Sequence, residues 1–188
     1  MFLSDDKTGI KINGKGFSLL EVSLALVFLV IPIVYAWKIN WSDSANQYTK
    51  QLAKVICQHA SALATYIDLS QSSSKKEVNI IALQDRNLLP LGGSDKLGKN
   101  TIHLYTNDQG VGLVILSGNN TNDIKMESIQ KMIGFYGASI IQDKGSEYIE
   151  NIGGYFRALK SSFPDIPGNI IGMAIIPPVR TPVHTCPI

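Results

Sequence analysis

One carboxylate lies inside an otherwise apolar segment near the start of the chain. Glu21 is the only charged side chain among the twenty residues from Phe17 to Ala36. As a helix rising about 1.5 Å per residue, such a segment would span about 30 Å, the thickness of the hydrocarbon core of a bilayer. A carboxylate is costly in lipid, so Glu21 needs a cationic partner or a specific use. The chemistry to expect at Glu21 is therefore charge pairing.

Glu21 ends a six-residue motif that begins at Gly16 and reads Gly-Phe-Ser-Leu-Leu-Glu. The segment before the motif is short and polar and carries three lysines against two aspartates. By the positive-inside rule, this basic flank predicts a cytoplasmic N-terminal side. The motif resembles the prepilin processing site of type IV pilins and type II secretion pseudopilins. In that family a membrane prepilin peptidase cuts after the glycine and methylates the new N-terminus.

The resemblance implies roles for three residues. The cut would fall between Gly16 and Phe17, which makes residues 1–16 a leader peptide and Phe17 the methylated first residue. The Glu21 carboxylate would neutralise the terminal amine of a neighbouring subunit and so set the register of assembly. A secretory signal peptide or a plain signal anchor is the simpler alternative. A signal peptide, however, normally has a shorter apolar core followed by a small-residue cleavage site, which residues 35–38 do not offer.

One helix is expected over residues 17–69. Residues 17–36 are apolar all round and form the predicted transmembrane half. Residues 37–69 carry an apolar stripe at three- and four-residue spacing and form the predicted amphipathic half. No glycine interrupts the helix, and Pro32 is its only proline. Proline removes one backbone hydrogen bond, a loss that membrane helices tolerate.

Residues 70–188 are expected to form a globular head of mixed structure. Asn107 to Gly110 is a hairpin signal between two predicted strands, and Gly134 or Gly137 is expected to end the longer of two short helices. The predicted strands cover residues 101–106, 111–116, 138–142, 152–159 and 169–176, and the short helices cover residues 80–86 and 123–136. The predicted class is α+β. The resemblance implies a type IV pilin fold, with a long N-terminal helical spine packed on an antiparallel β-sheet head.

The order of elements in the head points to one group within this family. Over residues 78–160 the order of elements is similar to the constant region of shufflon-type tip adhesins of conjugative and type IVb pili, and to related minor pilins. The likeness rests on residues 78–90, 97–101, 129–141 and 153–156. Those adhesins continue into a large receptor-binding region that residues 161–188 are too short to supply, so tip and shaft positions both stay open.

Cys57 and Cys186 are the only cysteines in the chain. The resemblance places both on the periplasmic side, where disulfides form and persist, so a bond between them is predicted. It would close a loop of about 130 residues and contribute roughly 4–5 kcal/mol in the chain-entropy model. The alternative is that Cys57 is an ordinary buried helix residue and Cys186 an exposed thiol.

Neither catalysis nor nucleic-acid binding is favoured by the remaining sequence. His59, His103 and His184 are scattered without metal-ligand spacing, so each is expected to be structural, and no metal or cofactor is expected. The formal net charge is +2, of which the leader contributes +1 from three lysines and two aspartates. The remaining chain is nearly neutral and lacks the basic face that nucleic-acid binding requires.

The expected protein is a minor pilin subunit of a type IV pilus, of the IVb or conjugative kind, and not an enzyme. It would enter the inner membrane as a single-pass protein with a periplasmic C-terminus and then join a filament at the cell surface. Its expected partners are other pilin subunits, prepilin peptidase, the inner membrane and, at a tip, a recipient-cell or host surface. A type II secretion pseudopilin is the nearer alternative. A membrane-anchored periplasmic binding domain or enzyme is the alternative from another class.

Overall fold

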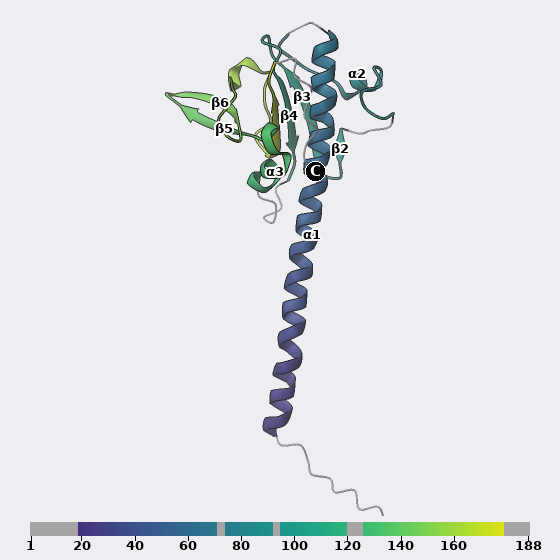
Figure 1. The fold of residues 1–188 in the computed structure, drawn as a ribbon, viewed down its shortest axis with the longest axis vertical. Helices are drawn as coiled ribbons and strands as arrows, with labels where there is room; N and C mark the ends of the chain where they lie inside the picture. The colour runs from purple at the N-terminus through teal and green to yellow at the C-terminus, as the bar shows by residue number, and fades with distance from the viewer. Residues whose placement is uncertain (1–18, 71–73, 92–94, 120–125, 179–188) are drawn as a thin grey trace, which may run out of the picture. The chain divides into compact units, whose positions relative to one another are not determined.

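The structure, a computed structural model, describes residues 19–70, 74–91, 95–119 and 126–178 (Figure 1). The chain divides into two compact units, Met1–Ser42 and Asp43–Ile188. The leader peptide predicted at residues 1–16 lies outside the described residues. So does Cys186.

Helix α1 (Leu19–Ser70) runs for 52 residues, contains Pro32 and contributes to both units. In the second unit its residues alternate between buried and exposed positions at helical spacing, and Leu52, Ile56 and Leu63 are completely buried. This part of α1 therefore has an amphipathic character, with one side packed in a core.

A five-stranded antiparallel sheet forms the centre of the second unit. Its long path runs β1–β3–β4–β8, and β2 pairs with the other end of β3. The predicted hairpin is confirmed, because β3 and β4 pair from Thr101 opposite Ser117 to Thr106 opposite Gly112. The side chain of Asn107 accepts hydrogen bonds from the backbone N–H groups of Gln109 and Val111 and so shapes the turn. The strands are β1 (Lys76–Glu77), β2 (Lys96–Leu97), β3 (Asn100–Thr106), β4 (Gly112–Ser117) and β8 (Ile170–Ile176).

A second, three-stranded antiparallel sheet contains β5 (Ala138–Asp143), β6 (Ser146–Asn151) and β7 (Arg157–Leu159), in that order. The strand predicted over residues 152–159 is wrong for residues 152–156, which form a turn between β6 and β7. Gly153 and Gly154 adopt φ values of +111° and +71°, which an extended strand cannot accommodate. Strand β6 was not predicted.

Short helices connect the two sheets and flank them. Helix α2 (Ile80–Gln84) begins at Asn79, whose side chain accepts a hydrogen bond from the Ile81 N–H, as an N-cap residue does. Helix α3 (Met126–Ile133) stops at Gly134, whose φ of +74° confirms one of the two predicted stops. Two 3₁₀ turns, η1 (Gly134–Tyr136) and η2 (Lys160–Ser162), follow α3 and β7.

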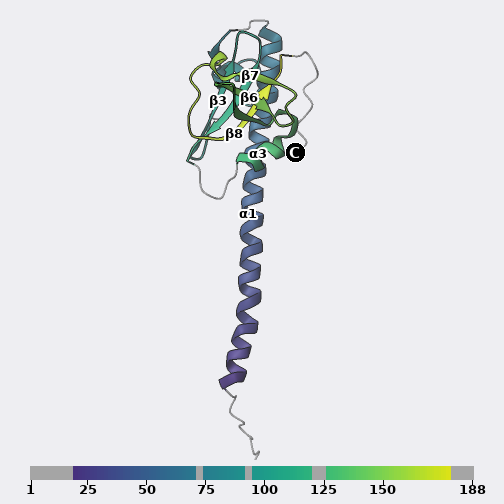
Figure 2. The ribbon, with the colours of Figure 1, turned by 90° about the vertical axis from the view of Figure 1, so that its left-hand side faces the viewer.

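The core of the second unit has two parts, one on each face of the central sheet (Figures 1 and 2). Val114 and Leu116 of β4 pack with α1, α2 and α3. Leu113 and Ile115 of the same strand pack on the opposite face with residues of β5, β6 and β7. Strand β4 is thus buried on both faces, and the unit has three layers.

The predicted type IV pilin fold, a long N-terminal helical spine packed on an antiparallel β-sheet head, is wrong. Two antiparallel sheets are present instead of one, and α1 is divided between the units at Ser42, so that only its later part belongs to the unit with the sheets. The second sheet is needed because β4 is apolar on both faces, and each face must be covered. The α+β class itself holds.

No helix within the described residues is long and apolar enough to cross a membrane.

Candidate functional site

The predicted processing residues cannot be placed by the structure. Gly16 and Phe17 lie outside the described residues. Glu21 belongs to the helical backbone of α1, but its side chain is outside the description. The cut after Gly16 and the charge-pairing role of Glu21 therefore stay predictions.

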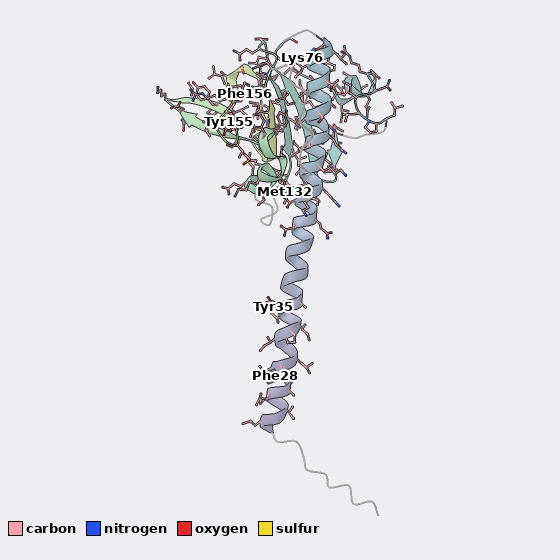
Figure 3. The ribbon with its side chains drawn as sticks, viewed as in Figure 1. Phe28, Tyr35, Lys76, Met132, Tyr155 and Phe156 are labelled. Carbon is pink, nitrogen blue, oxygen red and sulfur yellow. The ribbon has the colours of Figure 1, made fainter. Side chains whose placement is uncertain are left out.

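The start of α1 presents a continuous apolar surface. Thirteen large apolar side chains between Leu19 and Tyr35 are 47–90 % exposed, and Figure 3 labels Phe28 and Tyr35 among them. Ser23 is a polar residue of the same segment, and its Oγ donates a hydrogen bond to the Leu20 carbonyl at 2.9 Å. We call this set the N-terminal apolar surface: Leu19, Leu20, Val22, Leu24, Leu26, Val27, Phe28, Leu29, Val30, Ile31, Ile33, Val34 and Tyr35.

An apolar surface of this extent requires a partner. Full burial of one Val, Leu, Ile or Phe side chain contributes about 1.5–3 kcal/mol, so covering half of the thirteen would contribute on the order of 10 kcal/mol. Contiguous exposed apolar patches of this size mark sites of association. Pro32 lies within the surface and removes the helical hydrogen bond that the Phe28 carbonyl would accept.

Cys57 lies on the buried side of α1, in the core that α1 shares with the central sheet. It is disulfide-bonded, and the described part of the chain contains no free cysteine. Cys186, the other cysteine of the chain and the predicted partner of Cys57, lies outside the described residues.

His59 is a buried structural residue of α1. Its Nδ1–H donates a hydrogen bond to the Val55 carbonyl at 2.8 Å. Burial lowers the pKa of His59 below its usual value and outweighs the opposing effect of that hydrogen bond. Burial therefore favours the neutral form of His59 in the folded protein.

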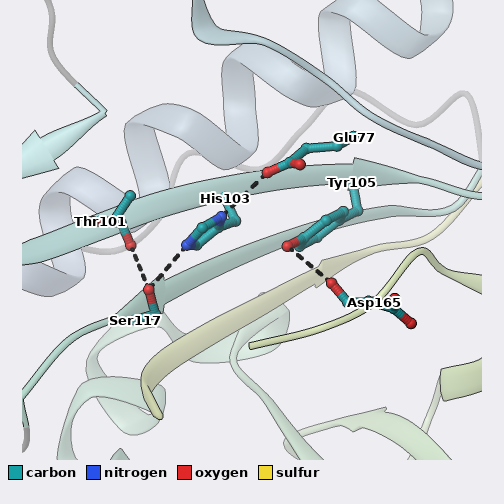
Figure 4. A network of polar contacts seen from close by, with 6 residues as sticks. All are labelled: Glu77, Thr101, His103, Tyr105, Ser117 and Asp165. Carbon is teal, nitrogen blue, oxygen red and sulfur yellow. Dashed lines mark hydrogen bonds and ion pairs between the residues drawn. The ribbon is translucent and has the colours of Figure 1, made fainter. Parts of the chain in front are cut away.

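His103 is the centre of a polar network on the central sheet (Figure 4). Its Nε2 lies 2.9 Å from Ser117 Oγ, and its Nδ1 lies 3.2 Å from Glu77 Oε1. The Tyr105 ring stacks beside the imidazole, with 6.2 Å between centroids, and its hydroxyl donates to the Asp165 carbonyl. Burial, together with the nearby carboxylates of Glu77 and Asp165, raises the pKa of Tyr105 to about 12.

A hydroxyl, an imidazole and a carboxylate in this order have the connectivity of an activated nucleophile. Ser117, however, is only 6 % exposed, and it also bonds to the Thr101 carbonyl at 3.4 Å. A cavity opens at the edge of β3, and Glu77 is the member of the network that lines it. It measures about 300 Å³ and is lined by Glu77, Val78, Asn79, Ile80, Asp95, Ile102 and Leu104. The network connects β1, β3 and β4. Because Ser117 is buried, we assign the network no catalytic role.

Two exposed aromatic rings were missed by sequence reasoning. Phe135 of η1 is 51 % exposed and Tyr155 of the β6–β7 turn is 81 % exposed, and their centroids lie 6.1 Å apart (Figure 3 labels Tyr155). They are twenty residues apart in the sequence, and no periodicity connects them. Only the fold of the second sheet brings them together.

Metal ligands were not expected from the sequence. Across the ranges that the structure describes, no three His, Cys, Asp or Glu side chains are grouped so that they could hold a metal ion.

Comparison with protein-family models, with curated proteins and with solved structures gives no match for this chain.

Proposed function

We propose that this chain is a pilin-like subunit that assembles into a filament through the N-terminal apolar surface of α1. The observation that carries the proposal is the exposure of the thirteen apolar side chains of that surface. The polar leader and the processing motif at residues 16–21 support it from the sequence.

The folded head does not need these side chains. Among the residues that the structure describes, the largest fully buried side chains run from Leu52 to Met173, and none belongs to the N-terminal apolar surface. Both parts of the core are built from residues 52–176. Apolar residues that contribute nothing to their own core have an intermolecular use, and association with other helices or with lipid fits them best.

The mechanism is packing with a defined register. The chain would be held in the inner membrane until the N-terminal apolar surface leaves lipid for the same surface of neighbouring subunits. Lipid is as apolar as the helices, so van der Waals packing rather than the hydrophobic effect would drive this step. Glu21 would pair with the N-terminal amine of a neighbour, which orients the incoming subunit. The partners are other pilin subunits and prepilin peptidase, and a recipient-cell or host surface if the subunit lies at a tip.

The test is the intact mass of the protein from cells with and without a prepilin peptidase. We expect a chain that begins at N-methylated Phe17 only when the peptidase is present. Gly16→Val should abolish the cut, whereas Gly14→Val, a matched change two residues earlier, should not. A chain that keeps residues 1–16 in the presence of the peptidase would overturn the proposal. Incorporation into surface filaments, rather than a defect in protein secretion, would then separate a pilin from a pseudopilin.

A further inference from the structure

Strand β5 is the outer strand of the second sheet, and its free edge is open to pairing. It pairs with β6 alone, over its whole length. In Figure 1 the hairpin of β5 and β6 extends away from the central sheet. An edge strand presents unpaired N–H and C=O groups to other chains, so proteins keep such strands short, charged, interrupted or covered. Strand β5 instead has six residues in regular register, with one charged side chain and no proline.

The other sheet edges are better protected. Strands β1 and β2, which lie along the outer edge of β3, have two residues each. Strand β8, at the opposite edge of the central sheet, is buried at every position after Ile170. Strand β7 has three residues and is followed by Lys160, whose Nζ lies 2.8 Å from Glu147 Oε2. Among the described residues, β5 therefore provides the one long, accessible strand edge.

Alternate residues of β5 direct their backbone groups to this edge. The Ile152 N–H donates to the Gly137 carbonyl at 2.7 Å, and this bond continues the register of the β5–β6 pairs. The direction of the backbone groups alternates along an antiparallel strand, so the odd-numbered residues of β5 face β6. The outward-facing residues are Ala138, Ile140 and Gln142.

Only part of the edge is available to a partner. Gln130 of α3, which is buried, donates a side-chain hydrogen bond to the Ala138 carbonyl. This bond confirms that Ala138 faces away from β6, and it occupies the start of the edge. Ile140 is partly exposed and Gln142 is exposed, and within the described residues no strand pairs with them on this side. Their N–H and C=O groups are the ones that an added strand would use.

An apolar row crosses the outer face of the second sheet and ends at β5. Ile141 lies opposite Tyr148, and Tyr148 lies opposite Leu159. Ile141 and Tyr148 are partly exposed and Leu159 is 44 % exposed, whereas Ile149 and Ala158 on the other face are buried in the core. Cross-strand apolar pairs stabilise a sheet, so the row favours a partner strand with an apolar residue opposite Ile141.

The one charge on β5 is already neutralised. Asp143 Oδ2 lies 3.2 Å from the Arg157 guanidinium, which also lies 4.9 Å from the centroid of the Tyr148 ring. Like charges directly opposite each other destabilise a strand pair. An antiparallel pair of β5 strands centred on Ile141 avoids this, because each Asp143 lies opposite Ser139 of the other strand.

We infer that β5 of one copy pairs antiparallel with β5 of a second copy, about a two-fold axis at Ile141. Ile140 of each strand would then exchange backbone hydrogen bonds with Gln142 of the other. The two Ile141 side chains would lie opposite each other and join the apolar rows of the two sheets. A second copy thus supplies the backbone groups, the apolar residue and the uncharged residue that this edge accepts.

The inference goes beyond the proposed function, because it concerns the head and does not involve α1. A contact in which both copies use the same surface closes on itself after two copies. In an assembly built through α1, pairing of β5 would therefore link subunits of two neighbouring filaments rather than extend one filament.

The experiment tests the register with single added cysteines in the full chain in detergent. Opposite residues of a non-hydrogen-bonded pair have Cα atoms about 4.5 Å apart, a distance that a disulfide spans. Ile141→Cys should form a disulfide-linked dimer under mild oxidation, with a yield about tenfold above that of Lys99→Cys, an exposed control in the β2–β3 turn. Ser139→Cys and Asp143→Cys should each give little dimer alone, yet a mixture of the two chains should cross-link. The parent chain gives the background.

A second variant removes a hydrogen bond that the pairing needs. Gln142→Pro deletes an outward N–H, which an edge strand tolerates in the single chain. Combined with Ile141→Cys it should lower the dimer yield about tenfold, whereas Gln142→Thr, which keeps the N–H, should leave the yield unchanged. Circular dichroism of each variant checks the fold, and the cysteine pattern tests the register without the proline.

The outcomes separate this inference from the proposed function. An Ile141→Cys yield no higher than that of Lys99→Cys would overturn the inference, as would a Ser139→Cys chain that cross-links alone as well as in the mixture. Neither result would change the cut after Gly16 or assembly through α1, which the mass of the processed chain and filament incorporation measure.

Discussion

Gly172 of β8 lies against side chains of both α1 and α3. A Cβ at Gly172 would lie 2.7 Å from Ile56 Cδ1 of α1 and 3.0 Å from Ile129 Cγ2 of α3. Both isoleucines are completely buried, so neither can turn away into solvent. Gly172→Ala therefore forces the packed core to shift.

The size of the effect follows from two opposing contributions. Overpacking a well-packed core costs about 1–3 kcal/mol. Replacing glycine with alanine restricts the unfolded chain and returns about 0.4–1 kcal/mol. The net loss of unfolding free energy is about 1–2 kcal/mol, which lowers Tm by roughly 3–6 °C for a unit of this size. Thermal and urea denaturation of the full chain, followed by circular dichroism, measures both quantities.

Two further variants make the test specific. Gly168→Ala is the matched control, because nothing lies within 4 Å of its added Cβ, and it should leave stability unchanged or raise it slightly. Ile56→Val removes the atom that the new methyl group meets and should cost about 0.5–1.5 kcal/mol by itself. Combined with Gly172→Ala it should cost clearly less than the sum of the two single changes. Full additivity, or a Gly172→Ala protein as stable as the parent, would refute the contact between α1 and β8.

Two other predictions concern charge. His59 has a lowered pKa in the folded state, so its contribution to stability is complete above about pH 6.5 and declines as the pH falls below that value and the unfolded chain takes up a proton. His59→Gln should flatten the unfolding free energy between pH 7 and pH 5, and an unchanged slope would contradict this account. Glu21→Val should leave membrane insertion intact yet prevent filament assembly, measured as sheared filament protein against membrane-bound protein, whereas normal filaments would exclude the charge-pairing role.

Local patterns identified several elements correctly. The β3–β4 hairpin was predictable because its strands are adjacent in the sequence and Asn107 and Gly110 favour the turn between them. The end of α3 was predictable because Gly134 can adopt a positive φ. The strand predicted at residues 152–156 was wrong because its apolar residues were read as a strand, although Gly153 and Gly154 lie among them. Both glycines adopt a positive φ and form a turn. Strand β6 has the sequence Ser-Glu-Tyr-Ile-Glu-Asn, and Ile149 is its single buried aliphatic residue. The alternation of apolar and polar residues that indicates a strand is therefore too weak there to predict β6.

Sequence by itself determined the α+β class, the apolar segment after Gly16 and the lone Glu21 within it, because these depend on composition and short-range spacing. Only the tertiary structure decided that β4 is covered on both faces by different layers, that His103 meets Ser117 and Glu77, and that Phe135 lies beside Tyr155. Those contacts depend on strand register and on turns far apart in the chain. A shift of one residue in strand register would send His103, Ser117 and Glu77 to the opposite faces of their strands, and no local pattern encodes that choice.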